Sequence, residues 1–251
     1  MARKTSDPYN YPILYDEQYW WKRNDIDFWR EMCDLIDGNH VLEIGAGTGR
    51  IAKPLLKQDI YYYGIDNSEV FINYTKQHLE DSRASFFKAD MQDFNLNTTF
   101  DLIFIPFNTF LHNLSTKDAE SCLKSIASHM TSQSLFIIDI LVPDPLFLYR
   151  PENIRFPIME FHSSQKKTVV LVEETITFDS TTHVLSVRWF YSTAVDKDFK
   201  SITFKMKMFY NSEMLDLLNN AGFSIKAMWG GYERERFDEQ SSQQIFCCKL
   251  A

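Results

Sequence analysis

The sequence predicts an α/β fold, an open and mainly parallel sheet flanked by helices, followed by an added group of antiparallel strands. Two observations support this prediction. Between residues 41 and 141, short apolar runs alternate with stretches of helical periodicity, which is typical of βαβ units. Between residues 168 and 210, β-branched or aromatic residues alternate with polar ones, which is typical of antiparallel strands with one solvated face.

The individual elements follow from spacing, capping residues and helix-ending glycines. A first helix is expected over 24–36, where apolar residues recur at helical spacing and Gly38 follows. Further helices are expected over 50–57, 68–79 with Ser68 as N-cap, 117–130, and 212–221 before Gly222. Strands are expected over 41–44, 61–65, 85–88, 100–105, 135–141, 168–178, 184–193, 202–210, 223–229 and 243–249.

Size and charge limit the class of partner. A chain of 251 residues fits one large domain, and its net charge of −8 argues against nucleic acid bound through a basic surface. The four cysteines lack zinc spacing and include the adjacent pair Cys247 and Cys248, which favours reduced thiols in the cytoplasm and no metal site. The N-terminus is polar and no apolar run reaches about 18 residues, so we expect no membrane partner. A small-molecule partner is the remaining expectation.

The most informative segment is a glycine turn that follows the apolar run at 41–44. Glycines at 45, 47 and 49 let a ligand approach the backbone and meet helix N–H groups. Arg50 stands where the dinucleotide pattern G-x-G-x-x-G would have its third glycine. Glu43 places a negative charge beside the turn, which disfavours a pyrophosphate and favours a cation. S-adenosylmethionine carries a sulfonium and an ammonium group, so the motif favours it over NAD.

With these features the chain resembles the class I S-adenosylmethionine-dependent methyltransferases. Within that superfamily it is most similar to the small-molecule branch that contains glycine N-methyltransferase and the amino-sugar N-methyltransferases. The resemblance covers nearly the whole chain. It is carried by V-L-E-I-G-A-G-T-G at 41–49, I-D-N-S at 65–68, A-D-M at 89–91, F-N-T-F-L-H at 107–112 and the strands inserted after the fifth strand.

The resemblance implies a Rossmann-like, seven-stranded methyltransferase sheet with an antiparallel β-sheet lid inserted after the fifth strand. It divides the chain into three parts. Residues 1–145 would form the cofactor-binding core with an N-terminal aromatic lid, and residues 146–210 would form the inserted strands. Residues 211–251 would supply the C-terminal helix and strands that complete the core sheet.

The same resemblance assigns residues to the methionine and ribose ends of S-adenosylmethionine. Gly45, Ala46 and Gly47 would bring the backbone to the methionine end, and Glu43 would order the ammonium group and the loop. Asp66, about twenty residues after the turn, would accept both ribose hydroxyls, a contact that serves NAD equally well. Asn67, its neighbour, either assists or caps the turn.

For the adenine, Asp90 would accept the exocyclic amine and the Met91 backbone N–H would meet a ring nitrogen. The N-terminal aromatic residues resemble the lid of the family. There, Tyr15 and Trp20 would lie over the cofactor, with a tyrosine hydroxyl or ring around the sulfonium through cation–π attraction, and Arg23 would meet the methionine carboxylate. Packing of an N-terminal arm on the sheet explains any one of these three residues equally well. Pro106, after the fourth strand, completes the predicted cofactor set.

The acceptor is expected at the end of the fourth strand. Asn108 and His112 match the family's Asn and His there and would orient the acceptor, although His112 is equally explained as a packing residue. A hydroxyl acceptor would need a base such as His112 or Tyr19. The tetrad N-P-P-Y of enzymes that methylate nucleobases or glutamine is absent. Leu141 stands where glycine N-methyltransferase has its carboxylate-binding arginine, which disfavours glycine as acceptor, and Arg150 is the nearest replacement.

These observations predict an S-adenosylmethionine-dependent methyltransferase that acts on nitrogen or oxygen of a small molecule, with nitrogen slightly favoured. Two alternatives remain open at this stage. One is a non-catalytic module that binds S-adenosylmethionine, and the less favoured one is an NAD-dependent oxidoreductase. The sequence is compatible with a monomer or a homodimer.

Overall fold

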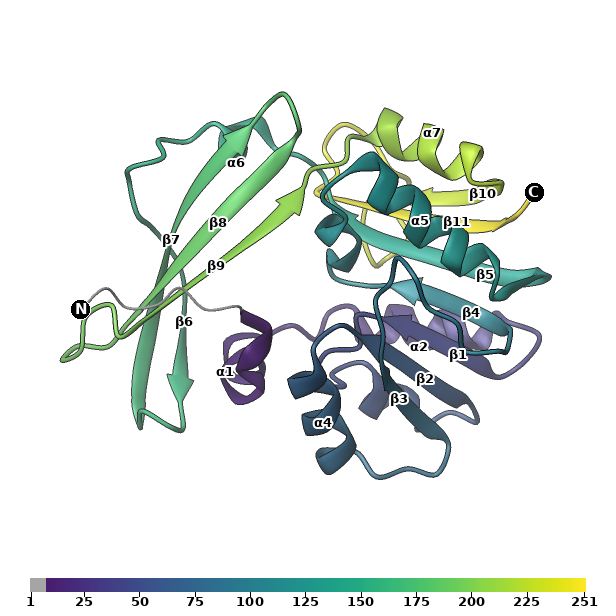
Figure 1. Ribbon diagram of the computed structural model, residues 1–251, viewed down its shortest axis with the longest axis horizontal. Helices are drawn as coiled ribbons and strands as arrows, with labels where there is room; N and C mark the ends of the chain where they lie inside the picture. The colour runs from purple at the N-terminus through teal and green to yellow at the C-terminus, as the bar shows by residue number, and fades with distance from the viewer. Residues whose placement is uncertain (1–7) are drawn as a thin grey trace.

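The computed structural model describes residues 8–251, which form two sheets (Figure 1). The larger sheet has seven strands in the order β10-β11-β5-β4-β1-β2-β3. The pairs from β3 to β5 are parallel, whereas β11 is antiparallel to both β5 and β10. The predicted seven-stranded α/β sheet is therefore confirmed. Its strands are β1 His40–Ile44, β2 Tyr61–Asp66, β3 Ala84–Lys88, β4 Phe100–Ile105, β5 Met130–Leu141, β10 Phe223–Trp229 and β11 Gln243–Leu250.

Helices cover both faces of this sheet and enclose two apolar cores. On one face, α2 and α3 pack on the strands, and the buried ring of Trp29 stacks on that of Phe104 at 4.6 Å. On the other face, α5 and α7 bury their apolar sides against β4 and β5. The helices are α2 Ile26–Asp34, α3 Ala52–Leu55, α4 Glu69–His78, α5 Thr116–Ala127 and α7 Asn211–Asn220.

The strands inserted after β5 form a second sheet, which we call the lid sheet. It is antiparallel throughout, in the order β6-β7-β8-β9, and stands beside the larger sheet (Figure 1). Alternate side chains such as Val172 and Val187 are buried in the same apolar cluster as α5, so the lid sheet shares a core with the larger sheet. Its strands are β6 Phe156–Ser163, β7 Thr168–Asp179, β8 Val184–Ser192 and β9 Lys200–Lys207, preceded by α6 Pro145–Leu148.

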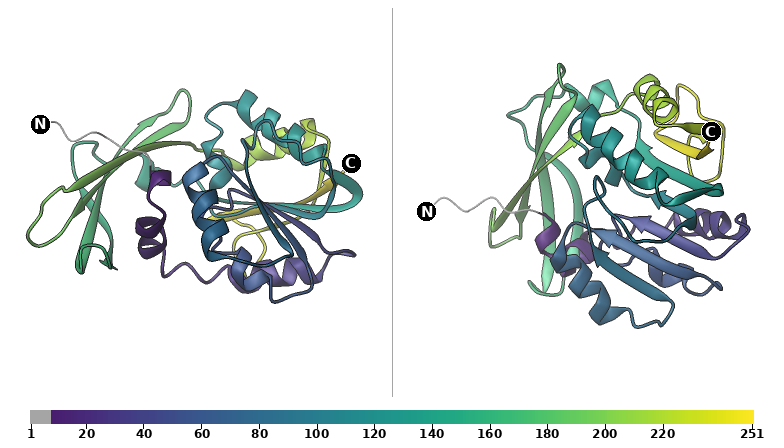
Figure 2. Two further views of the ribbon diagram at one scale, coloured as in Figure 1. Left: turned by 60° about the horizontal axis from the view of Figure 1, so that its bottom comes forward. Right: turned by 45° about the vertical axis from the view of Figure 1, so that its right-hand side comes forward.

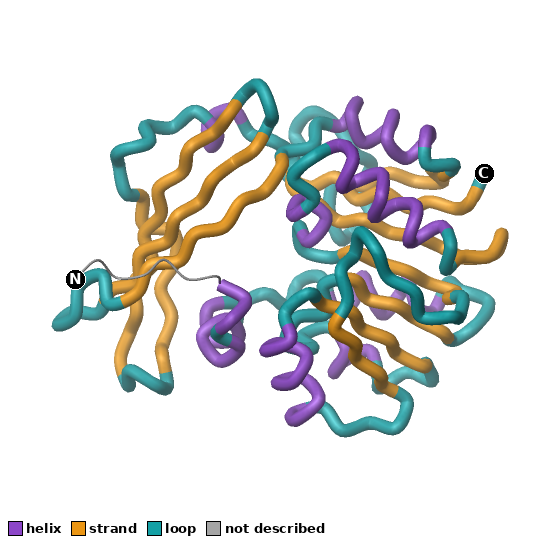
Figure 3. The backbone as a smooth tube through the Cα atoms, in the orientation of Figure 1, coloured by secondary structure: helices purple, strands orange, loops and turns teal. Residues whose placement is uncertain are grey.

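The short helix α1 (Pro12–Gln18) lies between the two sheets (Figure 2). Figure 3 shows it as a helix between the lid strands and α4. Gln18 accepts a hydrogen bond from the Tyr191 hydroxyl of β8 at 2.8 Å, and Glu17 accepts the backbone N–H of Ser164 at 2.9 Å. The N-terminal segment is thereby fixed to the lid sheet. Residues 1–7 of the predicted N-terminal lid lie outside the described residues.

Several predicted elements differ from the observed ones in their ends. The helix expected over 50–57 is reduced to the four residues of α3, which contains Pro54. The helix expected over 117–130 ends at Ala127, because β5 already begins at Met130. The strand expected over 202–210 ends at Lys207, and the last residues lead into α7. Strand β6 and helix α1 were not predicted.

The boundaries proposed at residues 145 and 210 stay predictions. They fall close to α6 and to the start of α7, on either side of the lid sheet. Over residues 8–251, none of the helices combines the length and the apolar character that crossing a bilayer requires.

Candidate functional site

A cavity of about 570 Å³ lies at the carboxyl ends of β1 and β2. Its walls come from the glycine turn, the starts of α4 and of the loop after β3, and the segment after β4. This is the edge at which parallel α/β sheets bind ligands, and the volume falls in the ordinary range of such pockets. Residues in its wall include Tyr9, Tyr15, Gly45, Gly47, Asp66, Asn67, Phe71, Asp90, Met91, Phe107, Thr109 and His112.

The glycine turn is left-handed at both glycines that face the cavity. Gly45 and Gly47 have φ angles of 78° and 56°. The N–H groups of Gly45 and Ala46 donate to Ile65 at 2.8 and 2.9 Å, which ties the turn to β2. A Cβ on Gly45 would overlap the Thr109 side chain, whereas one on Gly47 would meet nothing closer than 3.8 Å. Gly47 therefore borders open cavity, where a ligand can approach its backbone.

Asp66 joins the glycine turn to the start of α4. One carboxylate oxygen accepts the N–H of Gly47 at 2.9 Å, and the other accepts the N–H of Ser68 at 2.7 Å. Ser68 in turn caps α4 by accepting the N–H of Phe71 at 3.1 Å. The carboxylate is thus oriented at the cavity wall, with exposed Asn67 beside it. This is the position from which the sequence predicted contacts to ribose.

The loop after β3 brings Asp90 and Met91 to the cavity wall. Asp90 is exposed and accepts the backbone N–H of Gln92 at 2.9 Å, which shapes the loop. Met91 is half-buried, and its sulfur lies 3.6 Å from the side-chain nitrogen of Asn113. The predicted ribose and adenine residues are therefore brought together in one cavity.

The N-terminal helix closes the cavity with aromatic rings. The ring of Tyr15 lies 5.1 Å from Phe71 and 4.7 Å from Tyr19, and Tyr19 lies 5.2 Å from Phe107. Burial raises the pKa of Tyr15 and of Tyr19 above the usual phenol range, so both hydroxyls stay protonated near neutral pH. A protonated Tyr19 is a poor proton acceptor.

Helix α1 also contacts the glycine turn directly, because the Thr48 hydroxyl donates to the Asp16 carboxylate.

Two other residues that the sequence assigned to the cofactor lie outside the cavity wall. Trp20 is 63% exposed, and Arg23 is exposed with its guanidinium 3.4 Å from the carbonyl of Trp20. Neither is in the cavity wall, so the structure does not bring them to the predicted cofactor site.

Two successive residues after β4 adopt left-handed backbone conformations, Phe107 with φ of 50° and Asn108 with φ of 67°. Such strain is concentrated at functional sites. The Asn108 side chain accepts the N–H of Leu141 at 2.7 Å and thus points toward β5. Asn108 and the buried Pro106 are not in the cavity wall. That Asn108 orients the acceptor stays a prediction. Its hydrogen bond with Leu141 holds the turn against β5.

His112 faces the cavity at the end of the short 3-10 helix Thr109–His112. Its Nδ1 lies 3.2 Å from the Lys205 carbonyl of β9, and its Nε2 lies 2.6 Å from the Tyr9 hydroxyl. Because a carbonyl only accepts, we assign the proton of the neutral ring to Nδ1, and Nε2 then accepts from Tyr9. The ring joins the larger sheet, the lid sheet and the N-terminal segment. Tyr9 was not predicted as a site residue.

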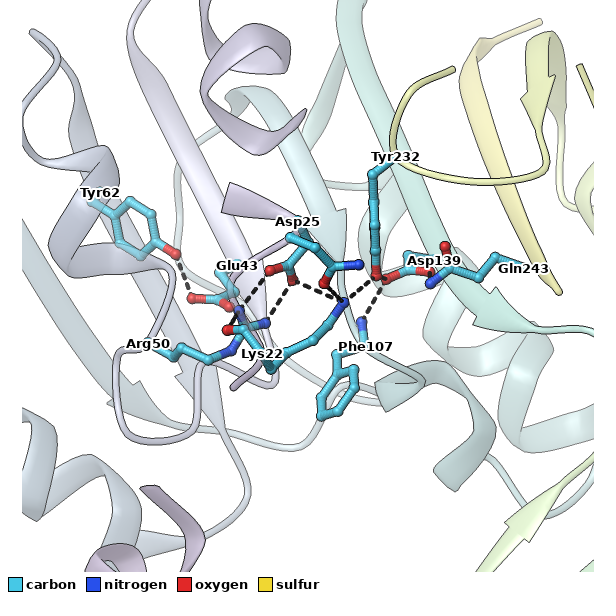
Figure 4. A network of polar contacts seen from close by, with 10 residues as sticks. Lys22, Asp25, Glu43, Arg50, Tyr62, Phe107, Asp139, Tyr232 and Gln243 are labelled. Atoms are coloured by element: carbon cyan, nitrogen blue, oxygen red, sulfur yellow. Dashed lines mark hydrogen bonds and ion pairs between the residues drawn. The ribbon is translucent and has the colours of Figure 1, made fainter. Parts of the chain in front are cut away.

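A buried ionic network lies next to the cavity (Figure 4). Asp25 binds the Arg50 guanidinium through both carboxylate oxygens, each at 2.7 Å, and its carboxylate lies 3.8 Å from the ammonium of Lys22. Glu43, only 2% exposed, accepts a hydrogen bond from the Tyr62 hydroxyl. Burial raises the pKa of Glu43 to about 8, against the lowering effects of this bond and of Arg50.

The structure corrects the expected position of Glu43. Side chains alternate along a strand, so Ile44 faces the cavity and Glu43 points to the opposite side of β1. The carboxylate therefore does not stand in the mouth of the site but is buried beside it.

Asp139 extends the network toward the end of the larger sheet (Figure 4). It accepts the N–H of Phe107 at 3.0 Å and the hydroxyl of Tyr232 at 2.6 Å, with the side-chain nitrogen of Gln243 at 3.5 Å. Burial raises the pKa of Asp139. Lys22 donates to the Tyr232 hydroxyl at 2.9 Å and so connects Asp139 and Tyr232 to Asp25. The sequence offered one signal for this residue, an acid inside the apolar run at 135–141.

The residues present fit S-adenosylmethionine. The cavity combines a glycine turn open at Gly47, a carboxylate at the end of β2 and a loop that can contact a base. The Phe107 ring separates this cavity from Lys22 and Arg50, whose cationic groups lie 5.3 and 5.6 Å from its centroid.

Comparisons with known proteins bear on the domain and on the fold. Residues 41–133 match the model of a methyltransferase domain. A cypemycin N-terminal methyltransferase from a Streptomyces species is 24% identical over 108 residues, which cover 43% of this chain and 44% of that protein. The chain thus matches less than half the length of this curated relative.

Two solved structures share the architecture over nearly their whole length. The CcbJ methyltransferase of Streptomyces caelestis has a TM-score of 0.81 and 18% identity, with 98% of both chains covered. CalS10, an amino pentose methyltransferase of Micromonospora echinaspora solved with S-adenosylmethionine bound, has a TM-score of 0.71 and 15% identity, with 95% and 97% covered. The expected resemblance is confirmed for the domain and for the fold, including the lid sheet.

Proposed function

Since this chain carries a methyltransferase domain within a class I methyltransferase fold, we propose that it transfers a methyl group from S-adenosylmethionine to a small-molecule acceptor. The observation that carries the proposal is the cavity at the ends of β1 and β2. There, the glycine turn, Asp66 and the Asp90–Met91 loop lie together, in the order in which they would meet methionine, ribose and adenine.

In this proposal the chain's residues bind and orient the cofactor. Gly47 offers its backbone to the methionine end, Asp66 accepts the ribose hydroxyls, and Asp90 with the Met91 backbone contacts the adenine. Tyr15 closes the cavity from α1 and provides a ring face for a cation. Thr109 packs against Gly45 and keeps the turn in place.

S-adenosylmethionine supplies a methyl group that is already activated by the sulfonium. The chain then needs to align the acceptor, exclude water and take up one proton. His112 is the residue that we assign to the acceptor side, because its ring is in the cavity wall and its Nε2 is the acceptor nitrogen of the neutral ring. The Lys205 carbonyl would stabilise the imidazolium that forms when Nε2 takes a proton.

Nitrogen is the acceptor atom that we favour. The relatives named for nitrogen-containing acceptors, an N-terminal methyltransferase and an amino pentose methyltransferase, support this choice. An amine loses its proton without a strong base, and Tyr19, the tyrosine considered as a base, is held as a neutral phenol outside the cavity wall. The same site could serve an oxygen acceptor through His112.

The test has two steps. Titration calorimetry with S-adenosylmethionine and with NAD asks which cofactor binds, and we expect heat from the first alone. A methyl-donor consumption assay over a panel of small amines and phenols then asks whether methyl groups are transferred. Binding without turnover across the whole panel would support a non-catalytic module, and binding of NAD alone would overturn the proposal.

A further inference from the structure

The ionic network next to the cavity contains more acidic groups than cationic groups. It contains three carboxyl groups, Asp25, Glu43 and Asp139, and two cationic groups, Lys22 and Arg50. The three acids and Lys22 are each at most 3% exposed, and the Arg50 side chain is 15% exposed. An uncompensated buried charge is unfavourable, so the network in an empty site favours one protonated carboxyl group.

Glu43 is the carboxyl group with the weakest compensation. Asp25 binds Arg50 through both of its oxygens, and Asp139 has a backbone N–H, a phenol and nearby Lys22 as partners. Glu43 accepts its hydrogen bond from the neutral hydroxyl of Tyr62 (Figure 4). Burial raises its pKa to about 8.

Charged and titratable groups approach Glu43 from every side. Arg50, from the loop before α3, favours the ionised form of Glu43, while Asp25 before α2 and Asp66 at the end of β2 favour its protonated form. Tyr62 of β2 donates to it, Cys33 of α2 lies close to Tyr62, and Tyr15 of α1 interacts with its charge. Of these groups, Tyr15 and Asp66 are in the cavity wall, so a charge in the cavity also acts on Glu43.

Resting on the proposed function, we propose that this network makes the site selective for the cationic cofactor over its neutral demethylated product. Glu43 holds a proton when the site is empty or contains the sulfide, and it releases that proton when the sulfonium binds. Glu43 is in this view a specificity-determining residue that acts through charge, without direct contact.

The charges and protons balance in each step. Binding brings in the positive charge of the sulfonium, and one proton leaves the Glu43 carboxyl group for solvent. During methyl transfer the carbon–sulfur bond breaks and its electron pair stays on sulfur, which becomes neutral, while the methyl carbon forms a bond to the acceptor nitrogen. The proton that the acceptor loses passes through His112 to solvent. Glu43 then takes a proton back from solvent. The site is thereby matched in charge to the reactant before transfer and to the sulfide after it.

The test is titration calorimetry with S-adenosylmethionine and S-adenosylhomocysteine near pH 7, in buffers that differ in ionisation enthalpy, which counts the protons released. We expect the sulfonium to release a sizeable fraction of one proton more than the sulfide. We also expect the preference for the sulfonium to rise about tenfold between roughly pH 6.5 and 9, equivalent to about 1.4 kcal/mol. The ligands' own amino groups titrate too, so the comparison is made against a variant.

Glu43→Gln keeps an oxygen that can accept the Tyr62 hydroxyl and removes the titrating group. It should lose the extra proton release and flatten the pH dependence of the preference. Asp27→Asn, which neutralises an 86% exposed acid on α2, is the matched control and should behave as the parent chain. Equal proton release by both ligands in the parent chain would overturn the inference. Binding of neither ligand would instead overturn the proposed function.

Discussion

The carboxylate of Asp139 and the backbone N–H of Phe107 form a hydrogen bond of 3.0 Å between β5 and the turn that follows β4. Asn108, the next residue in this turn, donates its N–H to the Asp139 carbonyl at 3.1 Å. One residue of β5 thus holds two consecutive left-handed residues through its side chain and its backbone. This turn leads directly into the segment that places Thr109 and His112 in the cavity wall.

Asp139→Ala should therefore destabilise the fold. The change leaves the Phe107 N–H and the Tyr232 hydroxyl without their buried partner, which costs roughly 1–3 kcal/mol per group. Denaturant unfolding followed by circular dichroism measures the loss. Tyr232→Phe removes a hydroxyl that donates to Asp139 and accepts from Lys22 but leaves the Phe107 bond in place, so it should cost less than Asp139→Ala. Equal losses in the two variants would mean that Asp139 does not hold the turn.

Gly47→Val should abolish cofactor binding, because the added side chain would project into the open cavity beside the glycine turn. The left-handed φ of 56° adds a backbone cost of about 1–2 kcal/mol, which a folded chain can tolerate. Gly222→Val, at a φ of 82° with no atom within 4 Å of its Cβ, carries the same backbone strain far from the cavity and serves as control. Calorimetry with S-adenosylmethionine that finds parent-like affinity in Gly47→Val would contradict the site.

Asp66→Ala should weaken S-adenosylmethionine binding about ten- to a hundredfold, since a charge-assisted contact to the ribose is worth roughly 1.5–3 kcal/mol. Asn67→Ala, at the exposed neighbouring position of the cavity wall, should change the affinity less than threefold if Asn67 only shapes the turn. A small loss in Asp66→Ala with a native circular dichroism spectrum would move the ribose contact to another residue.

His112→Ala should lower turnover and leave cofactor affinity almost unchanged. We expect a loss of about 10- to 100-fold if His112 orients the acceptor, and of up to about 10⁴-fold if it takes the proton. The measurement is the turnover rate across pH with an acceptor found in the panel. His78→Ala, an exposed histidine of α4, is the control. Parent-like turnover at every pH would leave His112 with a packing role.

The stability of the ligand-free chain should fall as pH rises from about 5 to about 8. Glu43 has a raised pKa in the folded chain, so the folded state binds more protons than the unfolded state over this range. Stability decreases with pH wherever the folded state is the more protonated one. Thermal unfolding at several pH values should show this decrease in the parent chain and a smaller one in Glu43→Gln. A parallel decrease in both chains would assign the effect to other groups.

The parts of the fold and site that could be predicted from sequence are those encoded locally. The alternation of apolar runs and helices predicted the strands and helices of the larger sheet, and the glycine turn, Asp66 and Asp90 are all in the cavity wall. Strand β6 contains Pro157, which disrupts the alternating pattern of a strand, and it was missed.

The ionic network could not be predicted, because it depends on which face of each element a residue occupies. Lys22 and Arg23 are neighbours in sequence, yet Lys22 is 3% exposed inside the network and Arg23 is on the surface. In this aromatic, irregular segment the sequence therefore could not show which of the two cationic side chains faces the interior. Glu43 and Ile44 show the same effect on β1, where adjacent side chains point to opposite sides.

The position of α1 between the sheets has a consequence for how the chain is made. Gln18 is bound by Tyr191, which lies 173 residues later in the sequence. Because α1 precedes the lid strands along the chain, it cannot make this contact until the lid sheet has emerged and folded. Contacts of such long range form late because a large loop must close first. The place of Tyr15 in the cavity wall thus depends on a helix whose docking needs a contact of long range in the sequence.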